Sequence, residues 1–396
     1  MELRLSNLAK TYPASGIRKM FDLAAGYDDV IALTLGEPNF ETPAYIKEAA
    51  KKALDENYTH YAPNAGLPVL REAIAKRYQK SHWAGYKAEN VIVTVGALEG
   101  LTLGMLALLN PGDEILVPDP GFANYYGQAK IVGAVPVPVP AHEENGFNMT
   151  AADIEKCITP KTKAIMITNP GNPTGTCLTE AQMKMLLDVA VAHDLYLVAD
   201  EVYREFTYDG EPLHSFGKFD YGQENLILID SVSKRFSACG ARIGCLISRN
   251  REFMANALKY CQARLSVATL DQIAAAALYS VGPEYFEQVR QEYKRRRDTV
   301  VRKLHEIPGV ICECPRGAFY LMAALPVDNA EKFQLWLLQE FEDHGDTVMF
   351  SAGESFYATP GRGRSEIRIA YVLKQEDLER AMDLLALGIR KYNETH

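Results

Sequence analysis

The chain has 396 residues, of which 47% are hydrophobic and 23% are charged, and its formal net charge is -9. A chain of this length exceeds one compact core, so two or three lobes are expected. The acidic balance argues against nucleic acid as a partner, because phosphate binding requires a basic surface, and no apolar run reaches the ~18 residues of a membrane span.

Short apolar runs alternate with helical patterns from about residue 90 to residue 250. Several runs are apolar on both faces, which predicts a largely parallel sheet covered by helices. The helix expected over Thr179–His193 begins at a threonine that is followed by Glu180. This pattern is typical of an open α/β architecture, in which ligands bind beyond the carboxyl ends of the strands. The expected strands are Val91–Val95, Ile115–Val117, Val135–Val139, Ala164–Thr168, Leu195–Ala199, Leu226–Asp230 and Ile243–Ser248.

After about residue 285 the pattern changes to that of a smaller α+β lobe. We therefore expect an N-terminal segment (1–45) that joins the small lobe, a large domain (46–284) and a small domain (285–396). The elements expected in the small domain are helices over Tyr285–Glu306, Asn329–His344 and Gln375–Lys391, and strands over Val310–Glu313, Ala318–Ala323 and Glu366–Tyr371.

Two strand ends in the first half carry candidate ligand contacts. The strand ending at Val95 runs into GALEG, where the amides of Gly96, Ala97 and Leu98 begin a helix and favour an anion. The next strand ends in DPGF, and Phe122 could cover a flat ring or serve as a core aromatic residue.

The next two strand ends carry an amide, a carboxylate and a phenol. NPGNPTG is a rigid turn-rich loop that could aim the amide of Asn172, or be only a tight connection. In ADEVY, Asp200 could hold a cationic nitrogen and Tyr203 could reach the same ligand. The alternative is a helix start with an acidic first turn.

A single lysine, Lys234, lies in the small-residue turn SVSKRFSACGARIG between two apolar strands. Lysine is rarely buried without a partner, so Lys234 is either solvated at a sheet edge or used chemically. Ser231, Ser233 and Arg242 in the same turn supply hydroxyls and a guanidinium of the kind that bind phosphate.

Far downstream, Arg368 lies within the apolar strand of SEIRIAY. A guanidinium in these surroundings needs an anionic partner. The partner is either a carboxylate in a structural ion pair or the carboxylate of a substrate.

The cysteines and the first residues bear on the compartment. Seven cysteines are scattered, and no second pair or histidine cluster accompanies Cys312 and Cys314 to complete a zinc site. The opening MELRLS has no apolar signal region. We therefore expect a cytoplasmic protein with reduced thiols and no bound metal.

Together these motifs resemble those of the class I/II aminotransferases, fold-type I enzymes that use pyridoxal phosphate. The opening SGIRKMFDLA also resembles the branch of prokaryotic aspartate and aromatic aminotransferases. The resemblance implies a three-layer αβα large domain with a mostly parallel seven-stranded sheet, a smaller α+β domain, and a homodimer with a shared active site. The motifs span nearly the whole chain in this order: LGEPNFETP, HYAPNAGLPVLREAIA, VTVGALEG, DPGF, NPGNPTG, ADEVY, SVSKRFSACGARIG, PRGAFY and IRIAY.

The resemblance also implies roles for the residues that act on the cofactor ring. Lys234 would form a Schiff base with the cofactor aldehyde and later move a proton at the substrate Cα. Asp200 would pair with the pyridinium nitrogen. Tyr203 and Asn172 would donate hydrogen bonds to the ring 3-oxygen, and Phe122 would stack on the ring.

Further implied roles concern the phosphate and the substrate. Ser231, Ser233, Arg242 and the amides of the Gly96, Ala97 and Leu98 turn would hold the phosphate, and Tyr61 would reach it from the other subunit. Arg368 would clamp the substrate α-carboxylate, with help from the Gly36 amide and Asn172. The reaction expected is transfer of an amino group from an L-amino acid, aspartate or glutamate or an aromatic one, to a 2-oxo acid such as 2-oxoglutarate.

The sequence departs from the family pattern at Leu98, where relatives specific for dicarboxylic substrates often carry lysine. Arg18 in the N-terminal segment is another possible cation for a distal carboxylate, although a solvated helix face is the simpler interpretation. A carbon–sulfur β-lyase on the same cofactor site is the alternative activity. A cofactor-sensing regulator would need a DNA-binding module, and a nicotinamide dehydrogenase would need a G-x-G-x-x-G turn after a strand; the sequence has neither.

Overall fold

The computed structural model describes residues 5–12, 24, 29–80 and 85–396. Its centre is a seven-stranded sheet in the order β2-β8-β7-β6-β5-β3-β4, which confirms the expected strands. β8 runs antiparallel to both of its neighbours, while the remaining pairs are parallel. The strands are β2 (Val91–Val95), β3 (Glu114–Asp119), β4 (Val135–Pro140), β5 (Thr162–Thr168), β6 (Tyr196–Asp200), β7 (Leu226–Ser231) and β8 (Ile243–Ile247).

Helices cover both faces of this sheet because its strands are apolar on both sides. In β7, Leu226 and Leu228 pack in one apolar cluster, and Ile227 and Ile229 pack in another. The first cluster includes side chains of α3 (Ala44–Asp55), α4 (Pro68–Lys80), α7 (Ala151–Cys157), α8 (Glu180–Ala192) and α11 (Thr269–Leu278), and the second includes those of α5 (Gly96–Leu108), α6 (Ala123–Ile131) and α10 (Arg251–Arg264).

The predicted helix over 179–193 is confirmed as α8, and its start has the expected cause. Thr179 is the N-cap, and its side chain accepts a hydrogen bond from the amide of Gln182, whose own side chain returns to the N-cap amide. This capping box satisfies donors that a helix start leaves open. None of the helices in the described part of the chain is long and apolar enough to cross a membrane.

The second lobe is a four-stranded antiparallel sheet in the order β12-β13-β10-β9. A separate two-stranded sheet pairs β1 with β11 in parallel, which joins the N-terminal segment to this lobe. The elements are β1 (Val30–Ala32), β9 (Ile311–Cys312), β10 (Tyr320–Ala324), β11 (Thr347–Met349), β12 (Ser351–Ala352), β13 (Glu366–Ala370), α12 (Pro283–His305), α13 (Ala330–Gln339) and α14 (Gln375–Thr395).

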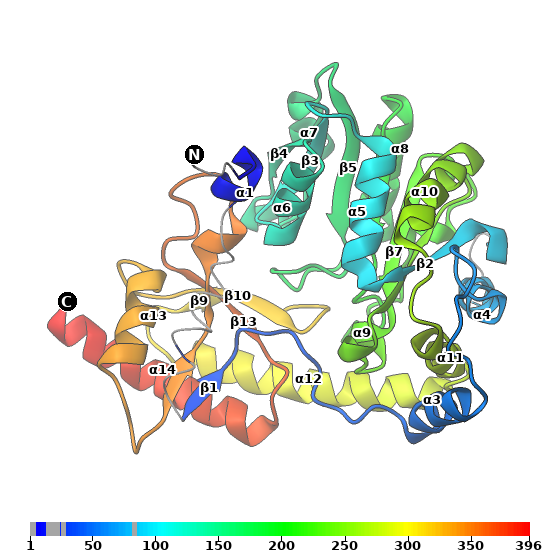
Figure 1. Cartoon of the computed structure of the whole chain (residues 1–396). Coiled ribbons are helices and arrows are strands. Elements are labelled where there is room, and N and C mark those ends of the chain that lie inside the picture. The colour runs from blue at the N-terminus through cyan, green and yellow to red at the C-terminus, as the bar shows by residue number, and fades with distance from the viewer. Residues whose placement is uncertain (1–4, 13–23, 25–28, 81–84) are drawn as a thin grey trace, which may run out of the picture.

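The long helix α12 connects the two lobes. Its Phe286 packs in the apolar core of the large lobe, whereas Tyr293 and Val300 pack in that of the small lobe. Figure 1 shows α12 running from α3 and α11 at one end to the strands of the small lobe at the other. The helix therefore packs against both lobes and connects their cores.

One predicted helix is too long. The pattern over Asn329–His344 predicts helix to His344, but α13 ends at Gln339. His344 and Gly345 have φ values of 54° and 88°, so the backbone there makes a left-handed turn rather than a helix. Arg380 of α14 holds this turn through Asp343 and Asp346, at 2.8 Å from each carboxylate.

Candidate active site

A cavity of about 470 Å³ lies beyond the carboxyl ends of β5, β6 and β7, and it is closed on the other side by residues of the small lobe. This is the position at which open α/β sheets bind ligands. The predicted site residues that line it are Gly36, Ala97, Leu98, Phe122, Asn172, Asp200, Tyr203, Ser231, Ser233, Lys234, Arg242 and Arg368.

Lys234 is half-buried on the one-turn helix α9 (Val232–Arg235), and it faces this cavity. Its Nζ donates a hydrogen bond to the carbonyl oxygen of Gly36 at 2.7 Å and lies 3.8 Å from Sγ of Cys239. Within residues 29–80 and 85–396, none of its contacts is with a carboxylate. The partners of the amine are thus neutral groups, which a ligand can replace.

Asp200, at the end of β6, is 5% exposed. Its carboxylate accepts hydrogen bonds from the Tyr125 hydroxyl at 2.8 Å and from the amide of Val202 at 3.2 Å. Burial raises the pKa of Asp200 to about 6. In the described chain no cation forms an ion pair with this carboxylate, so a positively charged ligand atom would lower its pKa and stabilise its charged form.

Arg368 of β13 reaches the opposite wall and is 3% exposed. Its guanidinium donates to Oδ1 of Asn172 at 3.0 Å, to the hydroxyl of Ser351 at 3.3 Å and to the carbonyl of Thr34. Burial lowers the pKa of Arg368. Its Nε has no hydrogen-bond partner, and no carboxylate pairs with it among the described residues. A buried cation of this kind favours an anionic ligand.

Tyr320 contacts site residues of both lobes, Tyr203 of the large lobe and Arg368 of the small lobe. Its hydroxyl lies 3.0 Å from that of Tyr203, and its ring lies 4.5 Å below the Arg368 guanidinium. A Cβ at position 36 would lie 1.6 Å from the Tyr320 oxygen, so this position requires glycine. Tyr320 and Tyr125 were not predicted from the sequence as site residues, although Tyr320 lies within the PRGAFY motif.

The third part of the site is an anion cradle. The amides of Gly96, Ala97 and Leu98 begin α5, and Gly96 has a φ of 71°. Ser231 caps α9 by accepting a hydrogen bond from the amide of Ser233 at 2.9 Å. Gly96 is not part of the cavity wall itself but lies beneath the guanidinium of Arg242.

The chemistry of the cavity matches the two ends of pyridoxal phosphate. Hydroxyls, helix-start amides and the Arg242 guanidinium suit its phosphate, and the buried Asp200 carboxylate suits its ring nitrogen when protonated. Lys234 faces the same cavity as both groups. The residues present therefore fit this cofactor.

We expect Gly244→Ala to disrupt the cradle, because a Cβ there would lie 2.4 Å from the Gly96 carbonyl carbon and 2.7 Å from the Ala97 amide nitrogen. The free energy of unfolding should fall by about 1–3 kcal/mol, as for other overpacked positions. Gly240→Ala is the matched control, since a Cβ at position 240 has no heavy atom within 4 Å. Urea denaturation of both variants measures the difference. Equal stability of the two would contradict the close approach of β8 to α5.

Two predicted contributors are not placed at the cavity. Tyr61 is 83% exposed and, in the described chain, does not belong to the cavity wall. Arg18 lies outside the described residues.

Known proteins are similar to this chain over most of its length. Residues 28–385 match the model of the family Aminotransferase class I and II. An aspartate aminotransferase of Pyrococcus horikoshii is 37% identical over 374 residues, which are 93% of this chain and 93% of the relative. An aromatic-amino-acid aminotransferase 2 of Thermococcus litoralis is 36% identical and covers 96% of this chain and 97% of its own length. Among solved structures, an aspartate aminotransferase from Thermus thermophilus with maleate superposes with a TM-score of 0.89 at 30% identity, covering 98% of this chain and 100% of that chain.

Proposed function

Because the chain belongs to the class I and II aminotransferases, and is therefore a transaminase, we propose that pyridoxal phosphate is its cofactor. We propose further that it moves an amino group from aspartate, glutamate or an aromatic L-amino acid to a 2-oxo acid such as 2-oxoglutarate. One observation carries this proposal. A single cavity brings together the amine of Lys234, the buried carboxylate of Asp200 and a buried guanidinium, Arg368, that has no carboxylate partner in the described chain.

When bound, pyridoxal phosphate supplies an electron-withdrawing ring that acidifies the Cα–H bond of an attached amino acid. Asp200 would keep the ring nitrogen protonated, and Phe122 would cover one face of the ring. Tyr203 would donate a hydrogen bond to the ring 3-oxygen. Asn172 accepts a hydrogen bond from Arg368 on Oδ1 at 3.0 Å, so its Nδ2 would be available to donate to the same ring oxygen.

Ser231, Ser233, Arg242 and the helix-start amides would hold the phosphate. Arg368 would bind the substrate α-carboxylate and so orient the Cα–H bond toward Lys234, whose amine would take this proton. The rings of Tyr320 and Phe356 lie 4.5 and 4.7 Å from the Arg368 guanidinium. These rings exclude water and strengthen the charge pairing.

We also propose a homodimer in which Tyr61 reaches the phosphate bound by the partner. Tyr61 is 83% exposed, and Leu265 and Val95 are also exposed, at 45% and 37%. The Ala62 amide donates to the Ser266 hydroxyl at 3.3 Å, which places Tyr61 and Leu265 on the same part of the surface. Exposed apolar side chains gathered in this way are typical of a surface that a second copy covers.

Arg368→Ala should raise the KM for the amino acid by about 10- to 100-fold, since one charge-assisted bidentate contact is lost, while the cofactor colour stays unchanged. Steady-state kinetics measure the KM, and the visible spectrum of the same preparation measures the cofactor colour. Arg368→Lys keeps the charge but loses the planar fork, and its KM should fall between the two. Unchanged kinetics in Arg368→Ala would remove this residue from substrate binding.

The proposed function is tested by single half-reactions. The yellow holoenzyme is mixed with one amino acid at a time, without any oxo acid, and the loss of colour is recorded together with keto acid and ammonia. A transaminase loses its colour and releases one keto acid per site and no ammonia. Continuous release of a thiol, a keto acid and ammonia from an amino acid with sulfur on its β-carbon would instead support the carbon–sulfur β-lyase, which the similarity to named aminotransferases does not favour.

A further inference from the structure

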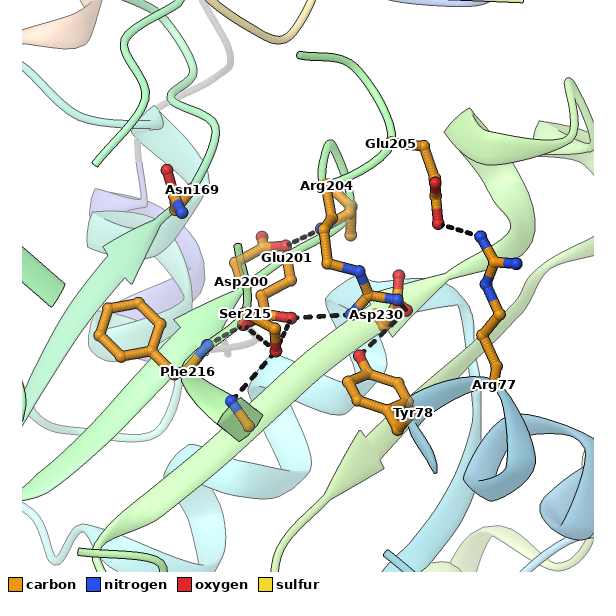
Figure 2. Close-up of polar contacts among 12 residues, drawn as sticks. Arg77, Tyr78, Asn169, Asp200, Glu201, Arg204, Glu205, Ser215, Phe216 and Asp230 are labelled. Carbon is orange, nitrogen blue, oxygen red and sulfur yellow. Dashed lines mark hydrogen bonds and ion pairs between the residues drawn. The ribbon is translucent and has the colours of Figure 1, made fainter. Parts of the chain in front are cut away.

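Behind the cavity lies a buried group of ionised side chains that the proposed mechanism does not use. It consists of three carboxylates and three guanidiniums, and we refer to it as the buried charge cluster; its members are Arg77, Glu201, Arg204, Glu205, Asp230 and Arg235. Except for Arg77, whose side chain is 24% exposed, every member is at least nine-tenths buried. Figure 2 shows Arg77 of α4, Asp230 of β7, and three residues of the segment after β6, Glu201, Arg204 and Glu205, lying near one another.

The centre of the cluster is the carboxylate of Asp230. It accepts from Arg235 Nη2 at 2.9 Å on Oδ1 and 2.6 Å on Oδ2. Oδ2 also accepts from Arg204 at 3.3 Å and from the Tyr78 hydroxyl at 3.1 Å, and Oδ1 accepts from the amide of Ser231 at 2.7 Å. Both oxygens of this carboxylate are therefore fully occupied.

The remaining contacts extend the cluster in two directions. Glu201 accepts from Arg204 at 2.8 Å, from the Ser215 hydroxyl at 2.7 Å and from the amide of Phe216 at 2.8 Å. Glu205 pairs with Arg77 at 2.6 Å and with Nε of Arg235 at 3.5 Å.

Four of the six members of the cluster are chain neighbours of site residues. Glu201 follows Asp200, Arg204 follows Tyr203, and Asp230 precedes Ser231. Arg235 follows Lys234 in the same way. In each pair one side chain lines the cavity and its neighbour enters the cluster. The cluster thus holds the backbone of the segments that carry the ring-nitrogen partner, the phosphate hydroxyls and the amine.

The helix α9 depends most on this support. It has four residues, and helices of this length do not hold their shape alone, because nucleation is costly. Asp230 fixes the start of α9 through the Ser231 amide and its end through Arg235. A single carboxylate therefore sets the orientation of the turn between these two points, and Lys234 lies on that turn.

We propose that Arg235 is a positioning residue, which through its two-oxygen contact with Asp230 sets the orientation of Lys234, Ser231 and Ser233 toward the cofactor. This inference rests on the proposed function, because it concerns how the same site holds pyridoxal phosphate. Arg235 touches neither cofactor nor substrate and acts only through α9.

The test compares Arg235→Lys with Arg77→Lys. Each variant keeps its positive charge and loses the guanidinium fork, but Arg77 pairs with Glu205 and is not next to a site residue in the chain. Three quantities are measured: the melting temperature of the apoprotein, the Kd for pyridoxal phosphate by equilibrium dialysis, and the visible circular dichroism per bound cofactor, which reports the orientation of the ring.

Arg235→Lys should raise the Kd for pyridoxal phosphate by about tenfold or more and change the visible circular dichroism, because small misplacements of a binding group have effects of this size. Arg77→Lys should lower the melting temperature while the Kd and the dichroism stay as in the parent protein. If Arg235→Lys fails to fold, Asp230→Asn, which keeps the shape of the side chain, is measured in the same way, with the same expected result.

A lower melting temperature in Arg235→Lys with unchanged Kd and unchanged dichroism would overturn the positioning role. An equal rise in Kd in the two lysine variants would overturn it too. Loss of colour by the parent protein on mixing with amino acids is the separate check on the proposed function. If the parent protein passes this check and Arg235→Lys behaves as Arg77→Lys does, the positioning inference alone is wrong.

Discussion

Lys234→Ala is expected to abolish the yellow colour of the protein and to lower kcat by about 10³-fold or more, because a positioned proton-transfer group and the covalent attachment are lost together. The amine now donates to the Gly36 carbonyl at 2.7 Å, a contact whose loss has little effect on the fold. The melting temperature should therefore change little. Absorbance, turnover and thermal unfolding of one preparation measure the three effects.

Lys218→Ala is the matched control for this variant. Lys218 also pairs through its ammonium, with Glu180 at 2.5 Å, but it lies away from the cavity wall. Its loss should leave the colour and the turnover unchanged. A Lys234→Ala variant that keeps both its colour and its rate would mean that another amine performs the chemistry.

Asp200→Asn is expected to lower kcat by about 10²- to 10³-fold, since the variant keeps the shape of the side chain but loses the charge that holds the ring nitrogen protonated. Its apoprotein should nevertheless be more stable than the parent at pH 8. The reason is that burial raises the pKa of Asp200 to about 6 in the folded protein, so ionising this carboxyl works against the fold.

The sign of the pH dependence follows from that raised pKa. The folded apoprotein binds the Asp200 proton more tightly than the unfolded chain does, so this proton stabilises the folded state. The stabilisation is complete below about pH 4 and is lost as the pH rises through about 6. The loss amounts to up to about 3 kcal/mol, given ~1.4 kcal/mol per pH unit. The asparagine variant has no carboxyl to ionise and does not lose this stability. Its free energy of unfolding, measured by urea denaturation, should therefore exceed that of the parent at pH 8 and equal it by pH 4. An advantage that is the same at both pH values would contradict the raised pKa.

The sequence predicted the residues that stand at strand ends in small-residue loops. Lys234, Asp200 and Arg368 are each unusual in their surroundings, since a charged group beside an apolar strand needs a partner. Their shared cavity confirms that the motifs meet in space. The roles assigned to these residues remain predictions, as does the contribution of Tyr61.

What the sequence did not predict has physical reasons. β1, β11 and β12 have two or three residues each, which is too short for a periodic pattern. Tyr125 and Tyr320 look like ordinary apolar residues of a helix and a strand, and only their hydroxyl contacts with Asp200 and Tyr203 distinguish them.

The buried charge cluster was not predicted either, because its residues also have no distinctive local pattern. Glu201, Arg204 and Glu205 lie within five residues of one another just after an expected strand, and Arg235 is next to Lys234, so their local sequence does not indicate burial. Their burial depends on pairing with Asp230 and Arg77, which are far apart in the chain. Such long-range charge balance leaves no local pattern.

The most direct test of this account is reductive trapping of the holoenzyme. Borohydride converts the carbon–nitrogen double bond between a lysine and pyridoxal phosphate to a permanent single bond, and peptide mass spectrometry then locates the added mass. We predict that the cofactor is attached to the peptide that contains Lys234 and to no other lysine. Attachment elsewhere, or no attachment in a preparation that is active and coloured, would contradict the assignment of this amine.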